Sequence, residues 1–137
     1  MPTIRRVLES ALYCDDLAAT ARFYREVLGL GQLFGDARLV ALDASGSTVL
    51  LLFARGASRT GMQYPEGTIP GHDGMGPAHV AFAVDRDELA AWEARLQDAG
   101  VAIESRVRWD RGGRSIYFRD PEGHSIELVT PGVWPTY

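Results

Sequence analysis

The stretch RSIYFRDPEGHSIELVT, from Arg114 to Thr130, decides the fold of this chain. It predicts two strands joined by a turn, because β-forming residues flank the turn-forming pair Asp120-Pro121 on both sides. The same short hairpin carries Glu122, His124 and Glu127. Side chains alternate between the two faces of a strand, so His124 and Glu127, three positions apart, point in opposite directions. We therefore interpret Glu127 as the candidate functional residue and Glu122 as a solvent-exposed turn residue.

Length and charge restrict the classes of protein to consider. The chain has 137 residues, 46% hydrophobic residues and a formal net charge of −4, which is typical of one globular domain. The charge gives no reason to expect nucleic acid as a partner, and no apolar run has the length of a membrane span. Cys14 is the only cysteine, so it cannot form an intrachain disulfide. We expect a cytoplasmic protein without nucleic-acid or membrane partners.

The pattern around the hairpin occurs twice. VLESALYC (7–14) predicts a strand, LAATARFYREVLGL (17–30) a helix capped by Asp16, and RLVALD and STVLLLF a hairpin that turns at Ser45-Gly46. HVAFAV (79–84) restarts the pattern, followed by a helix from Leu89 to Gly100 and the strands VAIESRV, RSIYFRD and HSIELVT. Asp85 and Glu88 resemble a capping box for that second helix. A strand, a helix and three strands are thus expected in each half.

Aligning the two halves places Glu9 on His79, at an offset of 79 − 9 = 70 residues. Neither half has enough core to be stable alone, so the halves should pair. The prediction is a single α+β domain over 1–137, with two paired βαβββ modules forming a curved sheet around a central cavity. Module one spans about 5–55, a Gly- and Pro-rich linker or lid about 56–77, module two about 78–131 and a tail 132–137.

Strand alternation also predicts which side chains meet. Glu9 and Tyr13 share the face of the first strand that lies opposite Leu12, and His79 lies opposite Val80 and Phe82. In the closing hairpin, Ser115, Tyr117 and Glu127 share one face. We expect Glu9, His79 and Glu127, which come from three separate strands, to converge on one concave surface. An imidazole and two carboxylates suit a divalent metal ion: Zn²⁺, Ni²⁺, Mn²⁺, Fe²⁺ or Co²⁺.

Each of these residues taken alone has a simpler interpretation. Glu9 can pair with an arginine, His79 can be a satisfied core histidine, and Glu127 can lie at a rim. The equivalent positions of Glu9 and His79 in a repeat favour the metal site. His72, in the linker, is interpreted as a loop-surface residue, with a reach into the site as the alternative.

Three motifs together resemble the vicinal oxygen chelate superfamily, which includes glyoxalase I, extradiol dioxygenases, fosfomycin-resistance proteins and bleomycin-resistance proteins. ALYCDDLAATARFYREVLGL resembles the opening strand and helix, GPAHVAFAV the start of the second module, and YFRDPEGHSIEL the closing hairpin. The resemblance covers nearly the whole chain. It implies a homodimer and a divalent metal that chelates neighbouring oxygens of a small-molecule substrate, with His79 and Glu127 as ligands.

Four positions depart from particular members of that superfamily. Glu9 stands where His or Gln is common, and Leu51 stands at the fourth ligand position of glyoxalase I. VRWDRGGRS lacks the acid–base histidine of extradiol dioxygenases, and Ala11 replaces a threonine of fosfomycin thiol transferases. These departures leave the subfamily open.

The resulting hypothesis is a metal-dependent glyoxalase-like enzyme with isomerase, lyase or transferase chemistry. Tyr117 and Glu127 are the candidate catalytic residues, since each can move a proton. The candidate substrate-binding residues share a polar side chain near the predicted cavity or its rim: Tyr13, Arg108, Arg114 and Ser115. Two alternatives stay open: a non-catalytic protein that binds an antibiotic or metabolite, and an extradiol-type dioxygenase.

Overall fold

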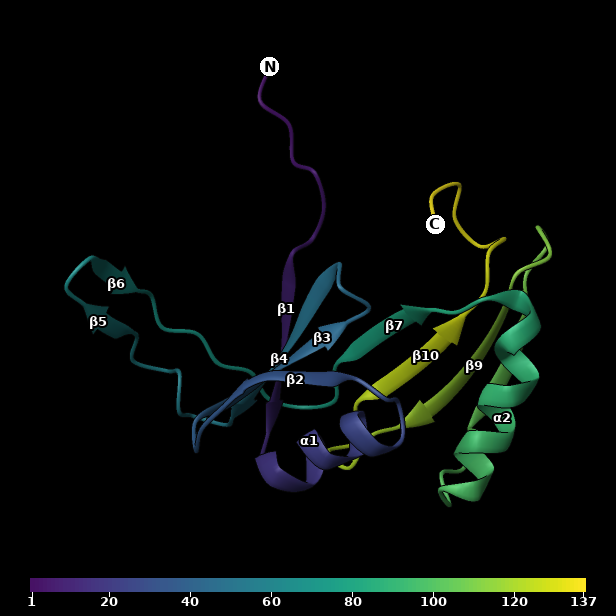
Figure 1. Ribbon diagram of the computed structural model, residues 1–137, viewed down its shortest axis with the longest axis horizontal. Coiled ribbons are helices and arrows are strands. Elements are labelled where there is room, and N and C mark those ends of the chain that lie inside the picture. The colour runs from purple at the N-terminus through teal and green to yellow at the C-terminus, as the bar shows by residue number, and fades with distance from the viewer. The chain divides into compact units, whose positions relative to one another are not determined.

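The computed structural model describes all residues of the chain, 1–137, and divides them into two compact units, Met1–Met75 and Gly76–Tyr137. Each unit contains one four-stranded mixed sheet and one α-helix (Figure 1). The α+β class and the two βαβββ modules predicted from the repeat are confirmed.

The first unit begins with β1 (Glu9–Cys14) and α1 (Leu17–Glu26), followed by β2 (Gly31–Gly35), β3 (Leu39–Ala44) and β4 (Thr48–Ala54). Its sheet has the order β1-β4-β3-β2, in which β1 runs parallel to β4 and the other pairs are antiparallel. A small hairpin of β5 (Met62–Tyr64) and β6 (Gly67–Ile69) extends away from this sheet (Figure 1). The segment predicted as a linker or lid therefore has secondary structure of its own.

The second unit repeats this plan. It contains β7 (His79–Ala83), a 3₁₀ turn η1 (Arg86–Glu88), α2 (Leu89–Asp98), β8 (Ser105–Arg108), β9 (Arg114–Arg119) and β10 (Ser125–Val129). Its sheet has the order β7-β10-β9-β8, with β7 parallel to β10. Because the order and the directions match those of the first sheet, each position in one unit has a counterpart in the other.

The two helices start differently although the sequence predicts a side-chain cap for both. At α1, Asp16 Oδ1 accepts the N–H of Ala19 at 2.9 Å, as predicted for an N-cap. At the second start, neither Asp85 nor Glu88 makes a side-chain cap hydrogen bond, so the predicted capping box is wrong. The chain instead enters α2 through η1, in which the Glu88 N–H bonds the Asp85 carbonyl.

The core of each unit follows strand alternation. Leu12 and Cys14 of β1 are buried, as are Ile116 and Phe118 of β9 and Ile126 and Leu128 of β10. Leu96, on α2, has no exposed surface. Replacing such a core leucine by alanine costs about 2–5 kcal/mol of stability.

Two strands differ from their predictions for a common reason. All five residues of β2 are exposed, so no alternation of apolar and polar residues marks it in the sequence. β8 begins at Ser105, later than the predicted VAIESRV strand, because residues 101–104 form no regular strand. Edge strands carry the weakest burial signal, and both β2 and β8 are edges.

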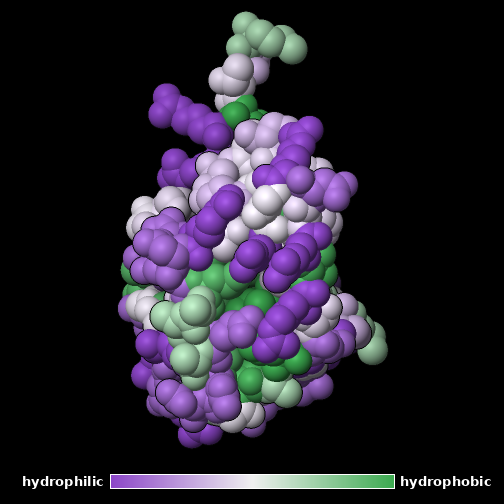
Figure 2. Space-filling view, turned by 90° about the vertical axis from the view of Figure 1, so that its right-hand side faces the viewer, coloured by the Kyte–Doolittle hydropathy of each residue, from purple (hydrophilic) through white to green (hydrophobic).

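Polar side chains cover most of the face seen in Figure 2, with patches of apolar surface between them. Neither helix has the length or the apolar composition needed to cross a bilayer.

Candidate metal centre

Glu127 is the third residue of β10 and is 7% exposed. Strand register places it between Ala81 of β7 and Tyr117 of β9. Ser115, two residues before Tyr117, donates its hydroxyl to Glu127 Oε1 at 2.5 Å. On one side of Glu127 lies the small side chain of Ala81. On the other side lie the hydroxyl-bearing residues Ser115 and Tyr117. A buried carboxylate in this position is held by hydrogen bonds and is not left to solvent.

His79 is the first residue of β7 and its ring faces Glu127. Its Nε2 lies 3.3 Å from Glu127 Oε2, while its Nδ1 donates to the Ser125 carbonyl at 2.9 Å. A carbonyl oxygen can only accept, so the proton is on Nδ1. The parallel pairing of β7 with β10 sets this arrangement, since His79 and Ser125 are register partners. The side chain of His79 is half exposed, so the pair opens to solvent on the imidazole side.

The contact between His79 and Glu127 brings two electron-pair donors together. With Nδ1 donating to the Ser125 carbonyl, Nε2 of a neutral His79 presents a lone pair to the Glu127 oxygen, which also carries lone pairs. A proton or a metal ion held between these two atoms, 3.3 Å apart, would make the contact favourable.

Tyr117 borders the same pair. Its ring stacks near that of His79, with 6.3 Å between ring centroids and 27° between planes. Burial raises the pKa of the Tyr117 phenol, and a hydrogen bond to the Glu127 carboxylate raises that pKa further. The phenol therefore keeps its proton at neutral pH and is a proton donor.

Trp109 adds a contact that the sequence did not suggest. Its indole Nε1 donates to Ser115 Oγ at 2.8 Å, so Trp109, Ser115 and Glu127 form a chain of hydrogen bonds. Strand alternation predicts Ser115 on the Glu127 face, whereas for Trp109 the sequence leaves open whether it lines the cavity or packs in a core or interface. Strand alternation gives one reason for this contact. Val107 pairs with Ser115, and Trp109 lies two residues after Val107, so Trp109 lies on the same face.

The two predicted substrate-binding arginines lie elsewhere. Arg108 and Arg114 are register partners in β8 and β9. They are next to the pair Val107 and Ser115, so their side chains lie on the other face of the sheet. They therefore project from the face opposite Glu127, the face on which Arg106 bonds Glu93 of α2. The second unit does not bring Arg108 and Arg114 to the Glu127 carboxylate.

His124 also lies away from the site. It is 1% exposed, and its Nδ1 accepts the N–H of Ala78 at 2.8 Å. The turn before it is held by Asp120, whose Oδ1 accepts the N–H groups of Glu122 and His124. Glu122 is half-buried, less exposed than predicted.

The first unit presents a different set of residues at the equivalent positions. Glu9 pairs with Val49 and Ala11 with Leu51, just as His79 pairs with Ser125 and Ala81 with Glu127. Glu9 is therefore the counterpart of His79, and Leu51 that of Glu127. Glu9 is exposed at the start of β1.

Further along β1, Tyr13 contacts the loop that follows β4. Its hydroxyl lies 2.6 Å from Nδ1 of His72, whose ring packs edge-on against Phe53. Burial, followed by the nearby charge of Asp73, raises the pKa of Tyr13. His72 is thus held against the sheet of the first unit by Tyr13 and Phe53.

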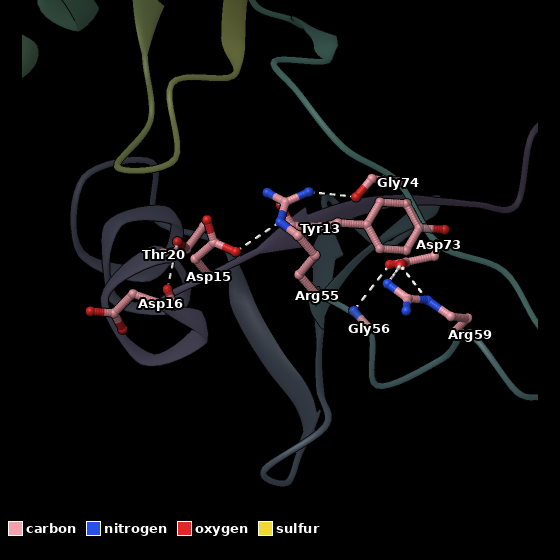
Figure 3. A network of polar contacts seen from close by, with 9 residues as sticks. All are labelled: Tyr13, Asp15, Asp16, Thr20, Arg55, Gly56, Arg59, Asp73 and Gly74. Carbon is pink, nitrogen blue, oxygen red and sulfur yellow. Dashed lines mark hydrogen bonds and ion pairs between the residues drawn. The ribbon is translucent and has the colours of Figure 1, made fainter.

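The polar network in Figure 3 holds the same loop. Arg55 bonds Asp15 at 2.8 Å and also the Gly74 carbonyl. Asp73 accepts the Gly56 N–H at 3.1 Å and an Arg59 N–H at 3.2 Å. Both ends of the 55–74 segment are therefore tied to each other and to β1.

The donor set at His79 and Glu127 fits a divalent metal ion. The pair provides one imidazole nitrogen and one carboxylate oxygen that converge, and each ligand has its other polar atom held by a neighbour, as in metal sites. Nowhere in the chain do three or more His, Cys, Asp or Glu side chains lie close enough together to hold a metal ion.

The sequence profile of the Glyoxalase/Bleomycin resistance protein/Dioxygenase superfamily matches residues 5–128. The chain belongs to this superfamily. Its relatives include metallothiol transferase FosB from Bacillus licheniformis, 29% identical over 121 residues, covering 88% of this chain and 71% of that protein. Metallothiol transferase FosB from Staphylococcus epidermidis is 32% identical over 118 residues, covering 85% and 75%.

A solved member of the superfamily shares the whole fold. The crystal structure of lactoylglutathione lyase from Agrobacterium tumefaciens superposes with a TM-score of 0.89 and 33% identity, covering 98% of this chain and 99% of that chain. The relatives named here are thus a transferase and a lyase of one superfamily.

Proposed function

We propose that this chain is a divalent-metal-dependent enzyme of transferase or lyase type that acts on a small, oxygen-rich molecule. The observation that carries the proposal is the 3.3 Å approach of His79 Nε2 to Glu127 Oε2, with the proton of His79 held on the other nitrogen. Two electron-pair donors aimed at one point indicate a site for a cation.

His79 and Glu127 would hold the metal ion. A bound divalent cation supplies Lewis-acid stabilisation of negative charge on a substrate oxygen. Glu9 is the register counterpart of His79, and its role as a ligand stays a prediction. Carboxylate ligands favour harder cations such as Mn²⁺ over softer ones.

The other residues of the site hold or move protons. Tyr117 keeps its phenol proton at neutral pH and can donate it to a negatively charged oxygen. Ser115 keeps its hydroxyl directed at Glu127, which fixes the carboxylate before a substrate arrives. Ala81 and Ala83 place only small apolar side chains beside Glu127 and Val129, with which they pair.

The names of the relatives suggest which reactions to test first. A metallothiol transferase and a lactoylglutathione lyase both handle a thiol or a thiol-derived compound. We therefore propose a thiol-containing compound as co-substrate or product, and fosfomycin and α-keto aldehyde–thiol adducts as the first compounds to test. We also propose a homodimer in the cytoplasm, as the superfamily resemblance implies, and light scattering would measure the oligomeric state.

Metal analysis of the purified protein tests the proposal directly. Wild-type protein incubated with Mn²⁺, Ni²⁺ or Zn²⁺ and desalted should retain stoichiometric metal, whereas Glu127→Gln and His79→Ala should lose it. Glu122→Gln is the matched control, because it changes a carboxylate of the same hairpin outside the site. Full metal occupancy in Glu127→Gln would exclude the ligand set. Metal-free wild-type protein that still binds a test compound would favour a non-catalytic binding protein.

A further inference from the structure

Trp109 occupies an unusual place for a tryptophan. It follows β8, in the turn before β9, and 37% of its surface is exposed. A buried indole N–H usually has a hydrogen-bond partner, but the partly exposed Trp109 could also donate to water. Here the N–H reaches Ser115 Oγ at 2.8 Å, and the Ser115 hydroxyl reaches Glu127 Oε1 at 2.5 Å.

We propose that Trp109 is a positioning residue that selects which oxygen of Glu127 faces the metal. This inference rests on the proposed function, since it concerns the carboxylate assigned there as a ligand. It adds a residue that takes no part in metal binding itself and acts through Ser115.

The direction of each hydrogen bond follows from chemistry. An indole N–H can only donate, and a serine hydroxyl has one proton and two lone pairs. Because Trp109 donates to Ser115, the hydroxyl is held as an acceptor on that side. Its single proton points to Glu127 Oε1 at 2.5 Å, although the Tyr117 phenol also lies within hydrogen-bond reach of Ser115. Without Trp109, the hydroxyl can rotate and offer its proton to water or to another acceptor.

Holding Oε1 determines the role of Oε2. With Oε1 occupied by the Ser115 proton, Oε2 is the oxygen that lies 3.3 Å from His79 Nε2. Glu127 is therefore arranged to bind through one oxygen, and rotation of the carboxylate toward two-oxygen binding would break the bond to Ser115. Neighbours of this kind typically change metal affinity by about 10–100-fold.

The turn that carries Trp109 is rigid enough for this role. The Trp109 N–H bonds the Gly113 carbonyl at 2.9 Å, and the Gly112 N–H bonds the Trp109 carbonyl at 2.9 Å. The Gly113 N–H also bonds the Gly132 carbonyl at 3.2 Å, and a Cβ on Gly113 would lie 2.7 Å from the Gly132 carbonyl carbon. Backbone thus packs directly on backbone, so the backbone that carries Trp109 cannot shift without moving the C-terminal segment.

Metal affinity measured by competition with a chelating dye tests the inference. Trp109→Phe keeps the aromatic ring and removes only the N–H, so its Mn²⁺ and Ni²⁺ dissociation constants should rise about 10-fold or more. Ser115→Ala should give a similar rise, and the double variant no further rise, because both act through one chain of bonds. Trp92→Phe on α2 is the matched control and should bind metal like the wild type.

A second measurement needs no metal. In protein with ¹⁵N-labelled tryptophan, Glu127→Gln should shift the indole N–H resonance of Trp109 and leave those of Trp92 and Trp134 in place. The resonance measurement keeps Trp109 in the protein, so it remains informative even if Trp109→Phe does not fold. An unmoved Trp109 resonance would overturn the inference.

The outcomes separate the two proposals. Wild-type protein that binds no metal contradicts the proposed function, whereas the resonance measurement still reports on the Trp109–Ser115–Glu127 chain. Wild-type protein that binds metal, with Trp109→Phe equal to it within twofold, overturns the role of Trp109 and leaves the proposed function standing.

Discussion

Leu51 and Glu127 occupy the same position in the two repeats: Leu51 pairs with Ala11 between β4 and β1, and Glu127 pairs with Ala81 between β10 and β7. The repeat thus offers two equivalent positions, and only the one in the second unit holds a carboxylate. The other holds a half-buried leucine on the face that also carries Glu9.

The two histidines of the second module should respond differently to substitution. His124→Leu removes the acceptor of the Ala78 N–H from a part-buried hydrogen bond, which should cost about 1 kcal/mol of stability. His124→Asn supplies an amide oxygen near the place of Nδ1 and should cost less. Chemical denaturation measures both, and metal content should stay unchanged. Loss of metal from either variant would contradict the placement of His124 outside the site.

Asp73 should make the 55–74 segment sensitive to acid. The Gly56 N–H bond is the largest cause that lowers the pKa of Asp73, with the Arg59 bond and charge adding to it. Because the folded pKa is below the unfolded value, the stabilisation is complete above the unfolded pKa and is lost as the pH falls through the folded pKa. Limited proteolysis at decreasing pH should show cleavage in 55–74 only at strongly acidic pH.

The control for that measurement is Asp73→Asn, which cannot ionise. Its cleavage in this segment should be faster than in the wild type at neutral pH and should change little with acid. A wild-type cleavage rate that is independent of pH would contradict the role given to Asp73.

The contrast between the two helix starts can be tested by a matched pair of substitutions. Asp16→Ala removes a cap that accepts the Ala19 N–H and should lower stability by about 1 kcal/mol. Asp85→Ala removes a side chain that caps nothing and should be nearly neutral. Urea denaturation of both variants measures the difference, and equal losses would contradict the assigned roles.

Much of the candidate site was predictable because strand alternation is a local property. Parity alone placed Ser115, Tyr117 and Glu127 on one face and His124 on the other, and the structure confirms this division. The resemblance to glyoxalase I pointed to Leu51 as a ligand position, and the register of the two sheets makes Leu51 the counterpart of Glu127. The exposed edge strand β2 was missed because burial is what produces the pattern, and its five residues are not buried.

The sequence by itself determined the two βαβββ repeats and the face on which each strand residue lies, since both depend on neighbours along the chain. Only the tertiary structure decided which atoms meet. His79 reaches Glu127 because parallel β7 and β10 pair in one particular register, and Trp109 reaches Ser115 because the turn between β8 and β9 folds back on Gly132. Register and backbone packing depend on segments far apart in the chain, so no local pattern records them.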